Sequence, residues 1–502
     1  MTYEVVVVGG GIGGLTAAAL VAARGRRVCL LEREPEAGGL AAPFDRAGYR
    51  FEPGAGLYAG WGPGDLHARV FAELPVPAPE AREVSPAYVV RLPDGADVRV
   101  GGPPEEFADA LRAAFPECAD AAARFYREAG ETARALRLAA QKFPPLAHAS
   151  KLTRLRLAAS APLVARRLLA RERDAVAAHL GGTSPRFRRF VDAQLQLSAQ
   201  APADSCAYLY GALALTEPLR GMHALGGGAG SLVAALVESI RACGGTVRTN
   251  AHALRLAFDA RGRAAGVELL TGETVEATRA VVSNLTVWDT YGKLVGLGRT
   301  PADVRARLKV WRGWGAYQVF VGVEEEAARR LPAEQVLAVA DASDGEALDP
   351  ERSLLMFSVA PAWDARAPAG QRAATLSTFT DAEQWFSFHE DESEHEEQDQ
   401  SFLEERWARL HAALPELGAG CEVVESSTPR TVYERTRRRL GMVGGVGQTL
   451  ASFGAAGPTH RTTVPGLYLV GDTAFPGNGV AAVTHSAVVA ADEIAPSGRS
   501  RR

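Results

Sequence analysis

The chain lacks the features that mark three common protein classes. It holds five cysteines, none at C-x-x-C spacing: Cys29, Cys118, Cys206, Cys243 and Cys421. This odd, scattered set argues against a disulfide framework and predicts reduced thiols in a cytosolic protein. No uninterrupted apolar run reaches the roughly 20 residues of a spanning helix, so we do not expect an integral membrane protein.

An excess of charge of one sign is also missing. The 55 Lys and Arg residues nearly balance 59 Asp and Glu residues, giving a net charge of −4. Nothing in this balance indicates a nucleic-acid partner. The chain opens almost at once on a strand-like segment, so we expect no signal peptide. The acidic run HEDESEHEEQD at residues 389–399 mixes His with carboxylates, but solvation of like charges explains it better than a metal site.

What the chain does have is a strong N-terminal motif, YEVVVVGGGIGGLTAAALVAARGRRVCLLE, at residues 3–32. Consecutive valines predict a strand buried on both faces, and the Ala-rich segment 15–24 predicts a helix packed on it. Between them Gly9, Gly11 and Gly14 stand at G-x-G-x-x-G spacing, and Glu32 ends the next strand. Such glycines bring pyrophosphate close to a helix N-terminus, and such an acid binds ribose hydroxyls. The motif predicts dinucleotide binding, and the acid favours FAD or NAD over a 2′-phosphate cofactor.

Several downstream segments can be placed around this unit. Gly38 and Gly39 allow the backbone to pass close to a ligand, and residues 44–51 predict a hairpin. The glycines at 226–230 favour a helix entry over a second phosphate loop, and residues 246–282 predict a small β-meander. Residues 313–324 and 353–380 predict strands of another sheet. Residues 151–174 form a basic amphipathic helix, which fits either a membrane surface or a solvated helix face.

A second informative motif lies near the C-terminus, PGLYLVGDTAFPGNGVAAVTHSAVVAADEI at residues 465–494. A buried strand ends at Gly471 and Asp472, where the carboxylate can accept hydrogen bonds from a ribityl chain. The helix that follows Gly479 begins with Val480 and can direct its positive end at a flavin.

Together these stretches resemble one family, the FAD-dependent phytoene desaturase and carotenoid isomerase group, which is distantly related to flavin amine oxidases. The resemblance covers VVVVGGGIGGL at residues 5–15, GMHALGGGAGSL and GGTVRTN within 221–250, AVVSN at 280–284, and LYLVGDTAFPGNGVAAV at 467–483. Leu40 stands where amine oxidases often carry Arg. Phe475 replaces the His of bacterial phytoene desaturases and looks more like the isomerase and later-step desaturase branch.

The resemblance implies a discontinuous α/β architecture. A Rossmann-like FAD domain would comprise residues 1–75, 221–300 and 458–495. A mixed α+β substrate cap would comprise residues 76–220 and 301–457, and residues 496–502 would be a flexible tail. The cofactor would be FAD, and the residues implied to bind it are Gly9, Gly11, Ile12, Gly13, Gly14, Glu32, Arg33, Gly38, Gly39, Gly471, Asp472, Gly479 and Val480.

The activity implied is an FAD-dependent oxidoreductase acting on a long apolar isoprenoid or polyene, first of all a carotenoid desaturase. Quinone or oxygen would accept the electrons, and the protein would be cytoplasmic with peripheral contact at the inner face of the membrane. The alternatives are a cis-trans isomerase that uses reduced FAD, a non-catalytic prenyl-binding escort protein, and a soluble amine oxidase.

No catalytic triad or acid pair marks the proton acceptor. If the resemblance holds, Glu52 and His485 lie near the flavin and are the candidates for it. The simpler interpretations are a loop carboxylate for Glu52 and a packed helix histidine for His485.

Overall fold

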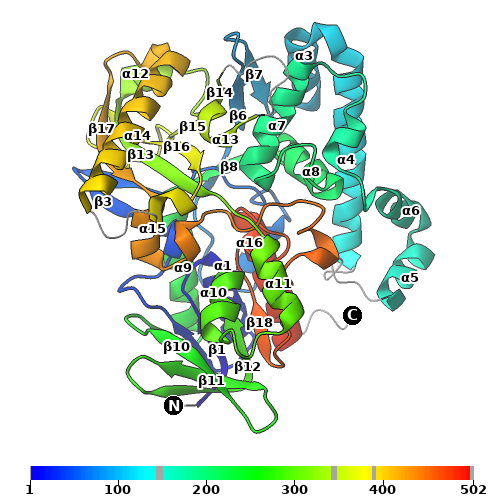
Figure 1. The fold of residues 1–502 in the computed structure, drawn as a ribbon, viewed down its shortest axis with the longest axis vertical. Coiled ribbons are helices and arrows are strands. Elements are labelled where there is room, and N and C mark those ends of the chain that lie inside the picture. Colours follow the sequence, from blue (N-terminus) through cyan, green and yellow to red (C-terminus); the bar gives the residue numbers. More distant parts are fainter. Residues whose placement is uncertain (1, 143–150, 341–347, 387–391, 498–502) are drawn as a thin grey trace.

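The computed structural model describes residues 2–142, 151–340, 348–386 and 392–497, and it contains two large sheets (Figure 1). The first sheet has the order β10-β11-β12-β1-β2-β9, and β18 pairs with β12. Its strands are β1 (Thr2–Val8), β2 (Val28–Leu31), β9 (Thr246–Arg248), β10 (Ala253–Phe258), β11 (Ala264–Leu269), β12 (Thr274–Ser283) and β18 (Leu467–Leu469). Strand β1 runs parallel to β2 and β12, so the ends of these strands meet at one edge.

Both faces of this sheet are covered, as the run of valines predicts. Val5 and Val7 pack with α1 (Ile12–Ala23), α9 (Ala229–Ala242) and α16 (Val480–Ile494). Val6 and Val8 pack on the opposite side with Val267 of the meander and with the segment around Trp288. The predicted β-meander is confirmed, since β10, β11 and β12 pair antiparallel in sequence.

The second sheet has the order β17-β13-β16-β15-β14-β6-β7. Its strands are β6 (Tyr88–Arg91), β7 (Asp97–Val100), β13 (Gly315–Glu324), β14 (Gln335–Val339), β15 (Leu354–Val359), β16 (Gln371–Thr380) and β17 (Cys421–Ser427). One face packs under α12 (Glu325–Arg330) and α14 (Glu392–Ala413) through Leu410 and Leu414. The other face packs on α4 (Ala119–Lys142), α7 (Pro185–Ala199) and α8 (Tyr208–Thr216).

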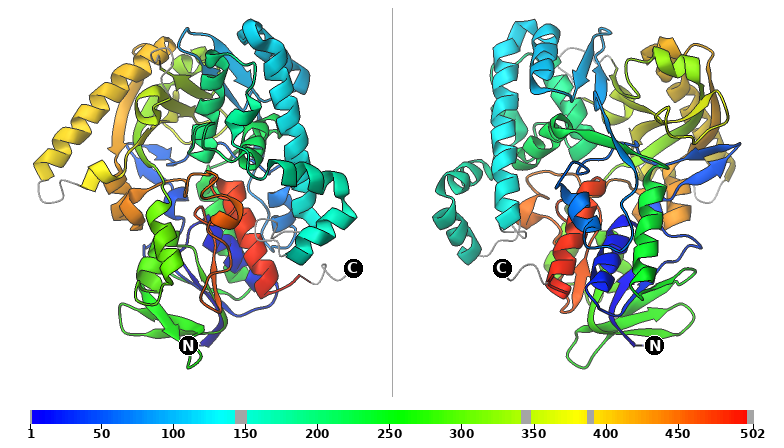
Figure 2. Two further views of the ribbon diagram at one scale, coloured as in Figure 1. Left: turned by 45° about the vertical axis from the view of Figure 1, so that its right-hand side comes forward. Right: turned by 180° about the vertical axis from the view of Figure 1, so that it is seen from behind.

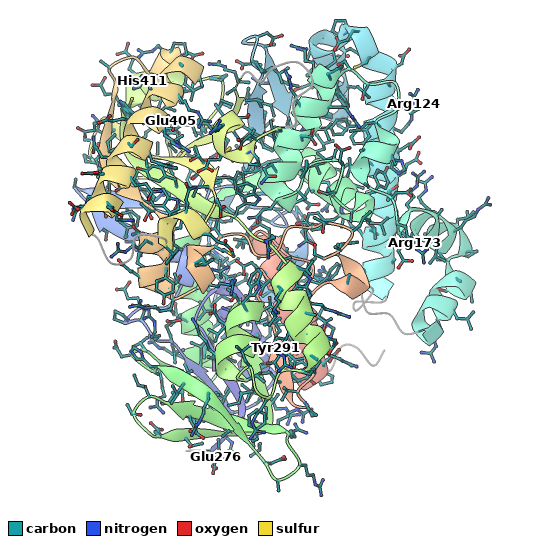
Figure 3. All side chains as sticks on the ribbon, in the orientation of Figure 1. Arg124, Arg173, Glu276, Tyr291, Glu405 and His411 are labelled. Carbon is teal, nitrogen blue, oxygen red and sulfur yellow. The ribbon has the colours of Figure 1, made fainter. Side chains whose placement is uncertain are left out.

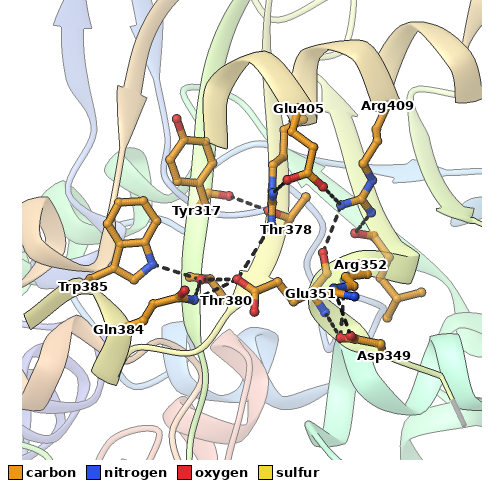
Figure 4. Close-up of polar contacts among 12 residues, drawn as sticks. Tyr317, Asp349, Glu351, Arg352, Thr378, Thr380, Gln384, Trp385, Glu405 and Arg409 are labelled. Carbon is orange, nitrogen blue, oxygen red and sulfur yellow. Dashed lines mark hydrogen bonds and ion pairs between the residues drawn. The ribbon is translucent and has the colours of Figure 1, made fainter. Parts of the chain in front are cut away.

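A polar network fastens α14 to this sheet (Figure 4). The hydroxyl of Thr380 donates to Glu351 at 2.7 Å and accepts from the indole N–H of Trp385 at 2.9 Å. Arg409 of α14 donates to the backbone carbonyl of Glu351 at 3.0 Å. Through Glu351 these bonds connect α14 to Thr380 of β16.

The remaining elements are short. They include β3 (Phe44–Arg46), β4 (Tyr49–Phe51), α2 (Leu66–Phe71), β5 (Ala81–Val84), α3 (Pro104–Ala114), β8 (Met222–Leu225), α10 (Val287–Asp289), α11 (Ala302–Val310), α13 (Pro350–Ser353) and α15 (Pro429–Thr436). Strands β3 and β4 form the hairpin expected at residues 44–51, with a turn at Ala47 and Gly48.

The basic segment 151–174 is not the single helix that its pattern predicts. It forms two helices, α5 (Lys151–Ser160) and α6 (Pro162–Arg171), which project from the body beside the end of α4 (Figures 1 and 2). Pro162 causes the break, because proline cannot continue a helix but fits its first turn. Among the described residues, no helix combines the length and apolar character needed to cross a bilayer.

Candidate cofactor and active site

The N-terminus of α1 lies open at the edge where β1 ends. Gly11 is its N-cap, no side chain caps it, and its first turn carries no acidic residue. The first backbone N–H groups of such a helix have no partner within it and carry partial positive charge. The local geometry therefore provides an anion site at the position that the G-x-G-x-x-G motif predicts.

The glycines of the motif are needed because other backbone atoms come very close. A Cβ on Gly14 would lie 2.1 Å from the carbonyl oxygen of Gly9. A Cβ on Gly13 would lie 2.6 Å from the side-chain oxygen of Asn284 and 3.0 Å from the backbone nitrogen of Gly471. The structure thus brings Asn284, at the end of β12, and Gly471, after β18, against the start of α1.

Glu32 ends β2 as predicted, and its carboxylate organises the loop around it. It accepts hydrogen bonds from the backbone N–H of Gly10 at 2.6 Å and of Glu34 at 2.9 Å. Burial raises the pKa of Glu32, while the backbone N–H groups of Gly10 and Arg33 act in the opposite direction. The next residue, Arg33, turns its guanidinium to Glu34 and to the backbone carbonyls of Glu434 and Arg435.

The glycine pair Gly38 and Gly39 lies against the G-x-G-x-x-G loop. The N–H of Gly38 donates to the carbonyl of Gly10 at 2.8 Å, and a Cβ on Gly39 would lie 3.6 Å from Cα of Gly11. Both residues have positive φ, at 135° and 57°. The loop after β2 therefore lies against the nucleotide loop, as expected of a segment that covers a cofactor.

The C-terminal motif converges on the same place. Gly471 has φ 106°, and the Asp472 carboxylate pairs with Arg438 at 2.7 Å between Oδ2 and Nη2. Gly479, at φ 90°, is the N-cap of α16, and Val480 is its first residue. Two ends of the chain separated by more than 400 residues thus meet at one site, as predicted from the sequence.

A cavity of about 1260 Å³ joins these elements. It is larger than the about 300–1,000 Å³ of ordinary ligand pockets, so it has room for a dinucleotide and a second ligand. Its nucleotide end is lined by residues 9–13, Glu32, Gly38, Gly39, Asn284 and Asp472. Its cap end is lined mainly by apolar and aromatic side chains: Leu57, Tyr88, Leu197, Tyr210, Leu213, Ala214, Met222 and Met356. Polar side chains, among them Arg137, Glu217 and Arg220, line it as well.

Glu52 lines this cavity, but its carboxylate is held by neighbouring protein groups. Oε2 accepts from the hydroxyl of Tyr58 at 2.6 Å and from the backbone N–H of Ala229 at 2.7 Å. Oε1 lies 3.5 Å from Arg366. These contacts give Glu52 a structural task at the start of α9, and its role as proton acceptor stays a prediction.

Similar contacts show what binds the backbone of the glycine run at residues 226–230. The N–H of Gly227 donates to Asp364 at 3.0 Å, and the N–H of Ala229 donates to Glu52. Protein carboxylates therefore occupy the N-terminus of α9. The predicted helix entry is confirmed.

His485 lies on α16 and lines the cavity beside α2. Within the described part of the chain, its imidazole has no hydrogen-bond partner. Burial, followed by the positive charge of Arg69, lowers the pKa of His485 to about 4. The ring is therefore neutral at pH 7 and has an unused nitrogen lone pair, although it is a weak base.

The sequence motifs did not single out Asn284 and Arg438 as site residues. Asn284 lies in the AVVSN stretch, directly after a buried strand, which is a usable signal for a site at the carboxyl edge of a parallel sheet. Arg438 lies in a run of arginines with no strand signal, so only the fold reveals its position. Within the described parts of the chain, no three His, Cys, Asp or Glu side chains gather where they could hold a metal ion.

Comparison with known proteins agrees with this geometry. The family model described as an NAD(P)-binding Rossmann-like domain matches residues 7–74. Prolycopene isomerase 2, chloroplastic, from an Oncidium hybrid cultivar is 26% identical over 511 residues, covering 98% of this chain and 84% of that protein. All-trans-retinol 13,14-reductase from Rattus norvegicus is 24% identical, with 94% of this chain and 82% of that protein covered.

Among solved structures, a double mutant of putrescine oxidase has a TM-score of 0.62 at 17% identity and covers 98% of this chain and 99% of its own. At this identity the likeness shows the fold. The Rossmann-like α/β fold class and the resemblance to the carotenoid isomerase and desaturase group are confirmed. The dinucleotide domain and the glycine cradle support FAD as the cofactor.

Proposed function

We propose that this chain, a relative of the carotenoid isomerase and desaturase flavoenzymes, is an FAD-dependent oxidoreductase that acts on a long apolar polyene. The observation that carries the proposal is the single cavity that joins a nucleotide cradle to an apolar passage in the cap. The cap carboxylate of Glu217, which also lines the cavity, is paired with Arg137 and Arg220, so it does not offer a free charge to the amine of an amine oxidase substrate. The intact cradle argues against an escort protein with a decayed flavin site.

The protein residues have binding and positioning roles. When bound, FAD supplies the hydride chemistry. The open N-terminus of α1 and Asn284 would hold its phosphates, and Asp472 with the N-terminus of α16 would hold its ribityl and flavin end. The apolar side chains of the cap exclude water and fix the polyene in one orientation.

Desaturation also releases a proton from the carbon next to the hydride donor. His485 is our proposed acceptor, because its neutral imidazole lines the cavity without a hydrogen-bond partner in the described chain. Glu52 is the weaker candidate, since its carboxylate already binds Tyr58 and Ala229.

A direct test is anaerobic incubation of the purified flavoprotein with polyenes in liposomes, with and without an added quinone. Desaturation predicts a product with a longer chromophore and lower mass that forms only with the acceptor. Ala214→Phe, which narrows the apolar passage, is expected to abolish product formation and to leave the flavin spectrum unchanged. A protein that binds no FAD would contradict the proposal.

Isomerisation is the second candidate. The similarity to a prolycopene isomerase over 98% of this chain supports it as the alternative. In the same incubation, isomerisation predicts altered cis/trans composition at constant mass, a requirement for reduced FAD, and no requirement for quinone.

We also propose that the α5–α6 hairpin contacts the membrane from which an apolar substrate would enter. Leu155, Leu163 and Leu169 are 67%, 82% and 55% exposed. Exposed basic residues lie among them, including Arg156 and Arg173, the latter labelled at the base of the hairpin in Figure 3. Exposed leucines beside basic side chains suit an anionic bilayer surface, and this surface would place the protein at the inner face of the membrane near a quinone acceptor.

The membrane proposal is tested by sedimentation with vesicles of phosphatidylcholine and phosphatidylglycerol. Replacing Leu155, Leu163 and Leu169 together by Ser is expected to release the protein from the vesicles. The matched control replaces Leu297, Val310 and Val423, which are 56%, 62% and 39% exposed elsewhere on the surface. Equal binding by both triple variants would refute docking through the hairpin.

A further inference from the structure

The segment 435–438, from the part of the chain assigned to the cap, lines the nucleotide end of the cavity. We infer that Arg438 in this segment binds the pyrophosphate of the dinucleotide, and that Asp472, besides its proposed contact with the ribityl chain, holds Arg438 in place. The inference rests on the FAD site of the proposed function and assigns to that site a cation that the sequence motifs do not contain.

The position of Arg438 follows from a short chain of contacts. The backbone of Gly471 packs against Gly13 in the first turn of α1, with 3.0 Å from its nitrogen to a Cβ placed on Gly13. The next residue, Asp472, holds the guanidinium of Arg438 at 2.7 Å. Both side chains are largely buried, 15% exposed for Asp472 and 16% for Arg438. Arg438 is therefore linked through Asp472 to the backbone that packs on the first turn of α1, and it lines the same cavity as that turn.

The guanidinium of Arg438 has more N–H donors than its protein contacts use. Its Nε donates to the carbonyl of Met442 at 2.9 Å, and one Nη2 hydrogen bond goes to Asp472. The other N–H groups of the guanidinium have no further partner within the described chain, and the residue lines the cavity. Since an arginine fork matches phosphate geometry with two parallel N–H bonds, these groups suit a pyrophosphate oxygen.

The neighbouring cations at this end have other contacts. Lys293 pairs with Asp289 at 2.7 Å, and Arg33 pairs with Glu34. Arg435 lies over the ring of Phe44, with 5.2 Å to its centroid, and Arg437 over the ring of Tyr433 at 5.1 Å.

A cation is also needed on chemical grounds. In the loop after β2, Leu40 follows the glycine pair, and Arg33 is already paired with Glu34. The glycine loop itself offers only backbone N–H groups. A pyrophosphate carries two negative charges, which a helix N-terminus alone neutralises incompletely. An ion pair between Asp472 and Arg438 fixes the guanidinium in one orientation before the ligand arrives, which reduces the entropy lost on binding.

The test compares ligands that contain or lack the pyrophosphate. Protein freed of FAD is titrated with FAD, ADP and riboflavin, by flavin fluorescence and calorimetry. Arg438→Met is expected to weaken FAD and ADP binding about ten- to a hundred-fold, the effect of one charged hydrogen bond, and to leave riboflavin binding unchanged. Arg438→Lys keeps the charge and is expected to recover part of the loss.

The matched control is Arg439→Met. Arg439 is the adjacent arginine, lies 5.8 Å from the ring centroid of Trp288, and does not line the cavity. Its replacement is expected to leave all three affinities unchanged. Circular dichroism of each variant separates loss of folding from loss of binding, and Arg438→Lys still tests the inference if Arg438→Met does not fold.

Two results would overturn the inference while leaving the proposed function intact. One is wild-type protein that binds FAD while Arg438→Met binds FAD and ADP equally well. The other is an equal loss for riboflavin, which would place Arg438 at the flavin end. If the wild-type protein itself binds neither FAD nor ADP, the proposed function and this inference fail together.

Discussion

At the scale of single residues, Glu52 shows how neighbouring protein groups can hold a cavity-lining carboxylate in place. We predict that Glu52→Gln lowers the free energy of unfolding by about 1–3 kcal/mol, because Arg366 loses a charged partner in a buried position. FAD binding and turnover of the folded protein should stay within a few-fold of wild type. Glu36→Gln, which changes an exposed carboxylate, should alter neither property. A loss of turnover with unchanged stability would instead make Glu52 the proton acceptor.

Two histidines make stability depend on pH. Burial lowers the pKa of His67 and of His485 to about 4 from an ordinary value of 6.5. Between these values the unfolded chain binds more protons than the folded one, so stability falls as the pH drops from about 6.5 to 4. We expect each histidine to lower the free energy of unfolding by about 2 kcal/mol when the pH falls from 7 to 5, measured by urea unfolding.

His67→Gln should remove about half of that pH dependence, whatever it does to stability at pH 7. His67 contacts Gly60 and Thr484 through its two ring nitrogens, so some loss at neutral pH is expected. His252→Gln, at an exposed position, should leave the pH dependence as it is. A wild-type protein equally stable at pH 7 and pH 5 would contradict the burial of neutral imidazoles.

The sequence predicts the site residues whose signal is local. Gly9, Gly11 and Glu32 could be assigned because turn, helix and strand end follow one another within about 25 residues, and each residue type has a defined job there. Asn284 and Arg438 could not be assigned in the same way. Their neighbours in space are distant in sequence, and neither residue type has a spacing rule that points to phosphate.

At the scale of elements, the close contact between α1 and the end of β1 requires a glycine at position 14. A Cβ on Gly14 would lie 2.1 Å from the carbonyl oxygen of Gly9, and neither backbone can move without shifting the sheet. We predict that Gly14→Ala lowers the free energy of unfolding by about 1–3 kcal/mol or more and weakens FAD binding. Chemical unfolding and flavin fluorescence measure the two effects.

Gly130→Ala provides the helical control. Gly130 lies within α4, and a Cβ there would meet nothing within 4 Å. Alanine is the better helix former, so this change should be neutral or stabilise by up to about 1 kcal/mol. Equal destabilisation by both substitutions would show that close helix–strand contact is not the cause.

Elements were predicted correctly where the period of the apolar residues and the turn residues indicate the same structure, as in the meander β10–β12 and the hairpin β3–β4. The basic segment 151–174 was predicted as one helix because its charge pattern runs through Pro162. The structure shows that the proline starts a second helix, α6. The pattern of charged and apolar side chains predicts which face of a helix meets solvent. Whether the helix continues depends on the backbone, and Pro162 lacks the N–H that a continuing helix needs.

At the scale of the whole molecule, the cavity lies where the two sheets meet. Its walls come from β1 and α1 on one side and from Gln318 and Met356 of the second sheet on the other. The strands of each sheet come from separate stretches of the chain, and no sequence pattern shows which stretches pair. The interleaved domain bounds were therefore expected only from the family resemblance, and they stay a prediction.

Removing FAD should increase backbone opening on both sides of the cavity. At free FAD of about 100 times its Kd, the bound state gains about 2.7 kcal/mol. We therefore predict that hydrogen exchange of the protein without FAD is faster in α1, in residues 435–445 and around Gln318, and is slowed in all three regions by FAD. The α5–α6 hairpin, which does not line the cavity, should exchange at the same rate in both states. Protection confined to residues 9–39 would mean that the second sheet does not respond to the cofactor.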